Sequence, residues 1–136
     1  AHIMIGTNDC RRTLDVPNVL HTGLPEYEKN VRFLVSALQA GGSRVIISSI
    51  PPVDAAAIAH DFPAHRILYR EDDRLAFNEA LRRIAAETGA VFNDMEPLYR
   101  AYAPQELTID GIHLNRGAQR LLAGRVLQCM QALRRQ

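Results

Sequence analysis

The feature that most constrains this sequence is an alternation of short apolar runs with longer amphipathic stretches. The apolar runs, which are typical of strands buried in a parallel sheet, are 3–5, 44–50 and 90–92. Apolar residues recur at helical spacing over 25–40, 73–88 and 116–133. Strands that alternate with helices predict parallel pairing and right-handed crossovers. We therefore expect one α/β domain with helices on the faces of a thin parallel sheet.

Local signals predict where the helices begin and end. Asp73 is expected to cap a helix that Gly89 closes, and Asn115 is expected to cap the last helix. The segment 51–70 is less regular and contains a short helical stretch at 55–59. In parallel sheets the chemistry collects where loops leave the carboxyl ends of the strands, so the loops that follow the three apolar runs are the first place to look for a site.

Composition excludes several classes of partner. With 16 basic and 15 acidic residues, the formal charge of +1 gives no electrostatic footprint for nucleic acid or for an anionic membrane. No apolar run approaches the roughly 18 residues of a membrane span. The two cysteines, Cys10 and Cys129, are too few for a disulfide framework and have no metal-type spacing. A cytoplasmic location is the default expectation, and export stays open because a native N-terminus can be missing.

The first candidate loop is Gly6-Thr7-Asn8-Asp9, directly after the first apolar run. A glycine there permits a sharp turn, and an asparagine at a strand end can donate a hydrogen bond to a developing oxyanion. The alternative is an Asx-type turn that only shapes the loop.

The second candidate is the run from Asp110 to Asn115, which reads Asp-Gly-Ile-His-Leu-Asn ahead of the last helix. Gly111 permits a tight turn that would let the Asp110 carboxylate reach the His113 imidazole. Such a pair is the base-and-orienter half of a nucleophilic triad, in which the histidine takes a proton from the nucleophile. The alternative is a surface turn in which Asp110 caps its own backbone and His113 is simply exposed.

Together, the two motifs on this strand–helix pattern resemble the SGNH (GDSL-type) hydrolases, from residue 2 to about residue 130. The resemblance implies a three-layer α/β/α, flavodoxin-like parallel sheet, of which this chain would hold strands three to five of five. It implies Asn8 as oxyanion donor, Asp110 as orienter and His113 as general base, with Gly6 and Asp9 shaping the loop. It implies no cofactor and no metal.

The family's Gly-Asp-Ser nucleophile motif is not in the sequence. The serines are Ser36, Ser43, Ser48 and Ser49, and none follows a Gly-Asp pair. Cys10, beside Asp9, is interpreted as a packed thiol rather than a nucleophile. We therefore expect the nucleophilic serine to lie outside this chain, and residues 1–136 to be a single, N-terminally incomplete SGNH domain.

A missing N-terminal part would have a structural consequence. In the family's strand order 2-1-3-4-5, the strand at 3–5 would lose one neighbour and become a sheet edge with unpaired N–H and C=O groups. We expect self-association or a partner segment to cover that edge.

The leading hypothesis is a serine ester hydrolase that acts on a small ester, inactive as an isolated chain. The alternative is a noncatalytic α/β module or a degenerate SGNH relative that acts in binding or assembly. A metal-dependent phosphoesterase is weaker, because Asp9, Asp110 and His113 are fewer ligands than two-metal sites use. The remaining histidines show no ligand spacing. Selectivity is expected to lie in the loops 10–24 and 51–70, where Ile58, Phe62, Ile67 and Tyr69 either pack down or line an acyl pocket.

Overall fold

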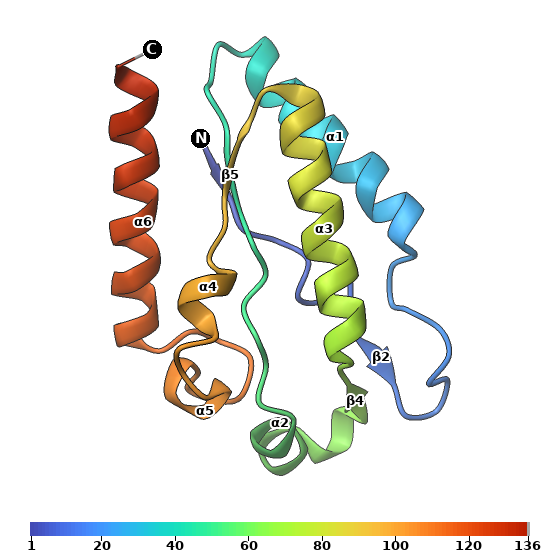
Figure 1. The fold of residues 1–136 in the computed structure, drawn as a ribbon. Coiled ribbons are helices and arrows are strands. Elements are labelled where there is room, and N and C mark those ends of the chain that lie inside the picture. Colours follow the sequence, from blue (N-terminus) through green and yellow to red (C-terminus); the bar gives the residue numbers. More distant parts are fainter. Residues whose placement is uncertain (136) are drawn as a thin grey trace.

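A computed structural model describes residues 1–135, and a three-stranded parallel sheet lies at its centre (Figure 1). The strands are β1 (His2–Ile3), β3 (Ile46–Ser48) and β5 (Val91–Asn93), in the order β1-β3-β5. Ile3 pairs with Ile47, which in turn pairs with Phe92. Strand β3 is thus the middle strand.

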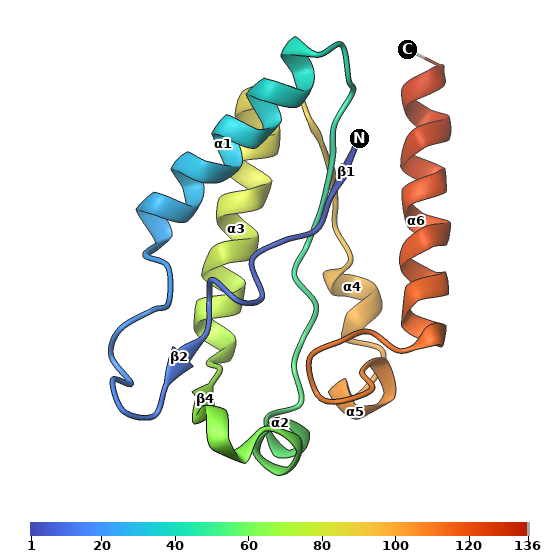
Figure 2. The same cartoon turned by 180° about the vertical axis from the view of Figure 1, so that it is seen from behind.

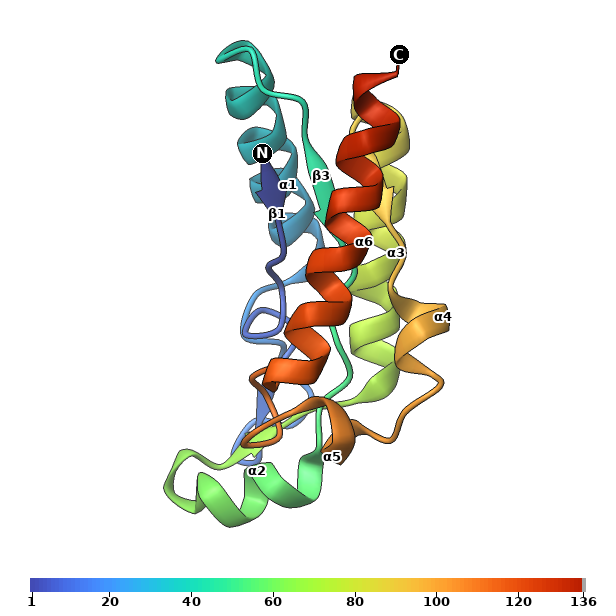
Figure 3. The same cartoon turned by 90° about the vertical axis from the view of Figure 1, so that its left-hand side faces the viewer.

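Helices cover both faces of this sheet. Helices α1 (Leu24–Ala40) and α3 (Glu71–Thr88) lie side by side on one face, while α6 (Arg116–Arg134) runs along the other (Figures 1 and 3). The fold is therefore three-layer α/β/α, as the family resemblance implies, with three parallel strands in the flavodoxin-like order. As expected, the Asn115 side chain caps α6 by accepting a hydrogen bond from the Ala118 N–H at 3.0 Å.

The main core lies between the sheet and the pair α1 and α3. Val31 and Val35 of α1 and Ile47 of β3 are completely buried. The Tyr27 and Phe77 rings join the two helices with their centroids 4.6 Å apart. A second, smaller cluster packs the start of α6 against the short helices α4 (Glu96–Tyr99) and α5 (Pro104–Leu107). The first cluster packs against one face of the sheet, and the second joins the segment after β5 to the start of α6.

The expected start of the second long helix is wrong. Helix α3 begins at Glu71 after Arg70, with no side-chain cap. Acidic residues fill its first turn and interact favourably with the helix dipole, so a capping side chain is not needed. Asp73 instead accepts two hydrogen bonds from the Arg12 guanidinium, at 2.6 and 2.7 Å.

The two long loops form one unit, which the sequence did not predict. Strand β2 (Arg12–Thr13) pairs antiparallel with β4 (Ile67–Leu68), and an ion pair joins Arg66 to Asp15 at 2.8 Å. Figure 2 shows this ribbon below α1 and α3. Between β3 and β4 the chain forms α2 (Ala55–Asp61), which extends the predicted stretch 55–59, and the 3-10 turn η1 (Pro63–His65).

Strand β1 lies at the margin of the sheet (Figure 3). Within residues 1–135 it pairs only with β3, so its other edge has no strand beside it. Regular pairing ends at Ile3, and the Met4 and Ile5 side chains that follow are 36% and 39% exposed. No helix in the described part of the chain is long and apolar enough to cross a membrane.

Two phenylalanines test the assignment of the core. Phe77 is 1% exposed between α1 and α3, whereas Phe33 of α1 is 71% exposed. We predict that Phe77→Ala lowers the free energy of unfolding by about 3–5 kcal/mol. The matched variant Phe33→Ala should change it by no more than about 0.5 kcal/mol. Urea unfolding followed by circular dichroism measures both, and equal losses would contradict this placement of the core.

Candidate active site

A cleft of about 520 Å³ lies beyond the carboxyl ends of β1 and β3. It brings the two predicted loops together, with Asn8 and His113 both in its wall. The residues that line it are Met4, Ile5, Gly6, Thr7, Asn8, Asp9, Pro51, Ile112, His113, Leu114, Gln119 and Leu122. Residues 94–100, which directly follow β5, are not among its lining residues, although we expected the loop after that strand to contribute as well.

Asp110 and His113 meet as their spacing predicts. The His113 Nδ1 lies 2.7 Å from the Asp110 Oδ2. An ionised carboxylate only accepts hydrogen bonds, so Nδ1 carries the proton and Nε2 is left as the acceptor. The His113 side chain is 72% exposed, so the ring is open to a reaction partner.

The second carboxylate oxygen of Asp110 makes the backbone turn. Oδ1 accepts hydrogen bonds from the His113 N–H at 2.8 Å and from the Ile112 N–H at 3.0 Å. The Asp110 carboxylate thus contacts the His113 ring through one oxygen and caps the backbone of its own turn through the other. Partial desolvation opposes ionisation, but these bonds outweigh it and lower the pKa of Asp110 to about 2.

Gly111 is required by the backbone of this turn. Its φ is +87°, and a Cβ there would lie 2.5 Å from the Asp54 carbonyl oxygen and 3.0 Å from the Ile58 nitrogen. The Asp54 N–H in turn donates to the Gly111 carbonyl at 2.8 Å. The Asp110–His113 loop is thus fastened to the start of α2.

Gly6 sets the backbone path of the Asn8 loop, and Tyr27 of α1 contacts the start of that loop. Gly6 has φ +120°, and a Cβ there would lie 2.5 Å from Ile50 Cδ1 and 2.6 Å from the Tyr27 hydroxyl oxygen. The buried Tyr27 hydroxyl donates to the Ile5 carbonyl at 3.0 Å. Sequence reasoning missed Tyr27, since helical spacing marks it only as a core residue.

The nucleophile candidates within the chain do not lie in this cleft. Ser48 and Ser49 are completely buried, and their hydroxyls bond to Asn93 and to the Met95 N–H. Ser48 also lies 2.8 Å from His2 Nε2. Burial raises the pKa of the Cys10 thiol to about 12, and this thiol is 1% exposed. Among the residues that line the cleft, none is a serine or a cysteine.

The other predicted features can also be placed. Asp9 lines the cleft beside Asn8. Ile58 is buried, and none of Ile58, Phe62, Ile67 and Tyr69 is among the lining residues. Within residues 1–135 no group of three or more His, Cys, Asp or Glu side chains could hold a metal ion.

The chain belongs to the GDSL-like lipase/acylhydrolase family, whose model matches residues 1–121. The functional class of that family is the hydrolysis of ester and acyl bonds. No curated protein matches the sequence.

Solved structures of similar fold are esterases and related hydrolases. A lipase/acylhydrolase from Enterococcus faecalis has a TM-score of 0.71 at 16% identity, covering 96% of this chain and 60% of its own. An acetyl-xylooligosaccharide esterase from Geobacillus stearothermophilus has a TM-score of 0.67 at 26% identity, with coverages of 93% and 57%. An alpha/beta hydrolase from the metagenome of Lake Arreo, Spain, has 0.69 at 25% identity, with the same coverages. The chain thus spans less than two thirds of each of these proteins.

Glycine substitutions test the geometry of the Asp110–His113 loop. Gly111→Ala combines a positive φ with backbone clashes, so we predict a loss of about 2–4 kcal/mol in the free energy of unfolding. Gly42 is the matched control, because its φ is +80° and a Cβ there would have no other atom within 4 Å. Gly42→Ala should cost about 1–2 kcal/mol from the backbone alone. Equal losses in thermal or urea unfolding would show that the contact with Asp54 and Ile58 is not tight.

Proposed function

We propose that this chain supplies the general base, its orienter and an oxyanion donor to the active site of a serine ester hydrolase whose nucleophile lies outside residues 1–136. The observation that carries the proposal is that His113, which lies 2.7 Å from Asp110, lines the same cleft as Asn8. A base without a nucleophile beside it is half of a catalytic arrangement.

The residues have distinct roles in the reaction. The serine Oγ bonds to the ester carbonyl carbon while His113 Nε2 takes the hydroxyl proton. Asp110 stabilises the imidazolium that forms. The Asn8 side-chain amide donates a hydrogen bond to the oxyanion of the tetrahedral intermediate. His113 then gives its proton to the leaving alcohol, and water, activated by the same histidine, releases the acid. Gly6 and Asp9 shape the loop that presents Asn8.

Similar proteins support these assignments. Structures of the acetylxylan esterase Axe2 from Geobacillus stearothermophilus include catalytic mutants in which a serine, an aspartate or a histidine is replaced by alanine. That aspartate and histidine are three positions apart, as Asp110 and His113 are, and the serine stands far ahead of them. Small acyl esters are accordingly the substrates we propose.

We also propose that the segment with the serine completes the sheet at β1. The unpaired edge of β1 is flanked on one face by a groove with Leu34 and Leu38 of α1, and on the other by one with Val126 and Met130 of α6. A strand with a helix on each side would bury these surfaces and end beside the cleft. Self-association through the same edge is the alternative.

A fluorophosphonate probe, which labels activated serines, tests the proposal. The chain 1–136 should remain unlabelled, because no serine among residues 1–135 lines the cleft with His113, and Ser48, which lies beside His2, is completely buried. A longer polypeptide, read from the coding sequence upstream of Ala1, should be labelled once, on a serine outside this segment. His113→Ala should abolish that labelling, whereas His21→Ala, at an exposed histidine outside the cleft, should not.

The contrary outcomes are equally specific. Labelling within residues 1–136 would contradict an external nucleophile, and an unlabelled longer polypeptide would favour the noncatalytic module.

Hydrogen exchange on the same samples tests whether a further strand pairs with the free edge of β1. The amide of Met4, which faces away from β3, should be protected in the longer polypeptide and exchange rapidly in the chain alone, and its protection in the chain alone at high concentration would favour self-association. A metal-dependent reaction is not favoured, because the donor groups within residues 1–135 are too few.

A further inference from the structure

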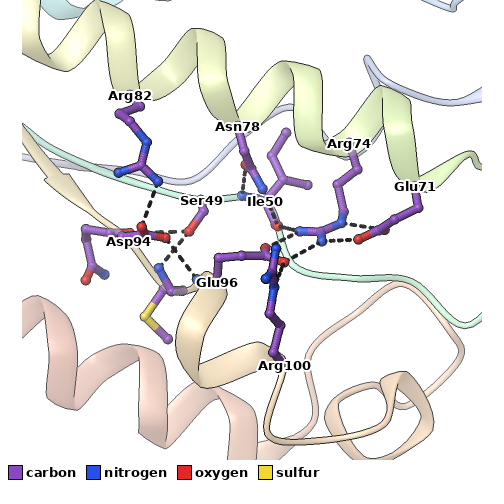
Figure 4. A network of polar contacts seen from close by, with 11 residues as sticks. Ser49, Ile50, Glu71, Arg74, Asn78, Arg82, Asp94, Glu96 and Arg100 are labelled. Carbon is purple, nitrogen blue, oxygen red and sulfur yellow. Dashed lines mark hydrogen bonds and ion pairs between the residues drawn. The ribbon is translucent and has the colours of Figure 1, made fainter.

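Ile50 is held by side chains rather than by a neighbouring strand. Strand β3 ends at Ser48, yet the chain stays buried through Ile50. Asn78 of α3 accepts a hydrogen bond from the Ile50 N–H at 2.7 Å and donates one to its carbonyl at 3.2 Å (Figure 4). The same carbonyl accepts a bond from Arg74 Nη1 at 2.8 Å. Asn78 thus bonds to the Ile50 N–H and C=O groups, which a neighbouring strand would otherwise pair.

Arg74 joins this residue to two further elements. Its side chain is 4% exposed and forms ion pairs with Glu71, at the start of α3, and with Glu96, at the start of α4. The bonds to Glu96 measure 2.8 and 3.0 Å, and Arg100 also donates to Glu96 at 3.2 Å. Figure 4 shows Arg74 between the two carboxylates. We call Arg74 and Asn78 the Ile50 clamp.

The Asn8 loop and the Asp110–His113 loop both contact the segment that begins at Ile50, the residue that the clamp holds. The Ile50 side chain lies directly against Gly6, the residue that begins the Asn8 loop. Pro51, the next residue, lines the cleft. Further along the same segment, Asp54 donates to the carbonyl of Gly111, between Asp110 and His113. A displacement of Ile50 would therefore move the oxyanion donor relative to the base.

We propose that Arg74 and Asn78 are positioning residues that set the separation between Asn8 and His113 by fixing the backbone of Ile50. A buried ion pair adds little net stability, because the cost of desolvation offsets its attraction, but it fixes the orientation of the groups that it joins. Catalysis is sensitive to that orientation, since a misplacement of about 1 Å can reduce a rate by 10²-fold. This role rests on the proposed function, while the geometric coupling can be measured without activity.

The test is NMR on the isotopically labelled chain 1–136, observing the Asn8 side-chain amide and the His113 ring in the folded state. Arg74→Met should shift both sets of signals and weaken the low-field proton signal of His113 Nδ1. Asn78→Asp, which keeps the acceptor and loses the donor, should produce smaller shifts in the same directions. Arg82→Met is the matched control, because Arg82 also lies on α3 and pairs with Asp94 without touching Ile50. In the Arg82→Met variant, the signals of Asn8 and His113 should be the same as in the unsubstituted chain.

A merely structural role gives a different pattern. If Arg74→Met and Asn78→Asp lower the melting temperature but leave the folded-state signals of Asn8 and His113 unchanged, the proposal is overturned. Should Arg74→Met not fold, Asn78→Asp alone decides between the two patterns. A failure of fluorophosphonate labelling in the longer polypeptide would contradict the proposed function and leave these signals, which need no nucleophile, unaffected.

Discussion

The rest of the structure depends on the parallel pairing of β3 with a strand on each side. Residues 45–50 are all buried, because helices cover both faces of this segment and β1 and β5 flank it. Parallel pairing places the carboxyl ends of β1 and β3 at the same edge of the sheet. The Asn8 loop, which leaves β1, and the segment that leaves β3 therefore meet. Asp54 in that segment donates to the Gly111 carbonyl and so holds the His113 loop at the same edge, although Asn8 and His113 are far apart in the sequence. The cleft follows from the direction of the strands.

The sequence predicted the parts of the fold that depend on local periodicity. Buried strands and amphipathic helices have patterns that a single sequence shows, and a spacing of three with a glycine between is enough to bring Asp110 to His113. The family and its three-layer fold followed from the two motifs and are confirmed. The roles of Asn8, Asp110 and His113 in catalysis stay predictions.

Other parts depend on contacts that no local pattern marks. Asn78 and Arg74 bond to the Ile50 backbone across more than twenty residues, and nothing in their spacing indicates a backbone partner. The pairing of β2 with β4 joins two segments that look like separate loops. The capping role of Asp73 was predicted wrongly, because an acidic residue near a helix start can either cap the helix or form an ion pair. In the structure Asp73 pairs with Arg12.

Asp110 links the fold to the chemistry, since one of its oxygens orders the loop and the other orients His113. A pKa lowered in the folded state means that ionised Asp110 stabilises the fold above its ordinary pKa, 3.8, and that this contribution disappears as the pH falls through about 2. The most direct test is an NMR titration of the Asp110 carboxyl carbon in the folded chain. We predict a midpoint near 2, which His113→Ala raises only partway toward 3.8, because the backbone N–H groups of residues 112 and 113 still donate to the carboxylate. A midpoint at 3.8 that His113→Ala leaves unchanged would contradict the pairing of this carboxylate with His113.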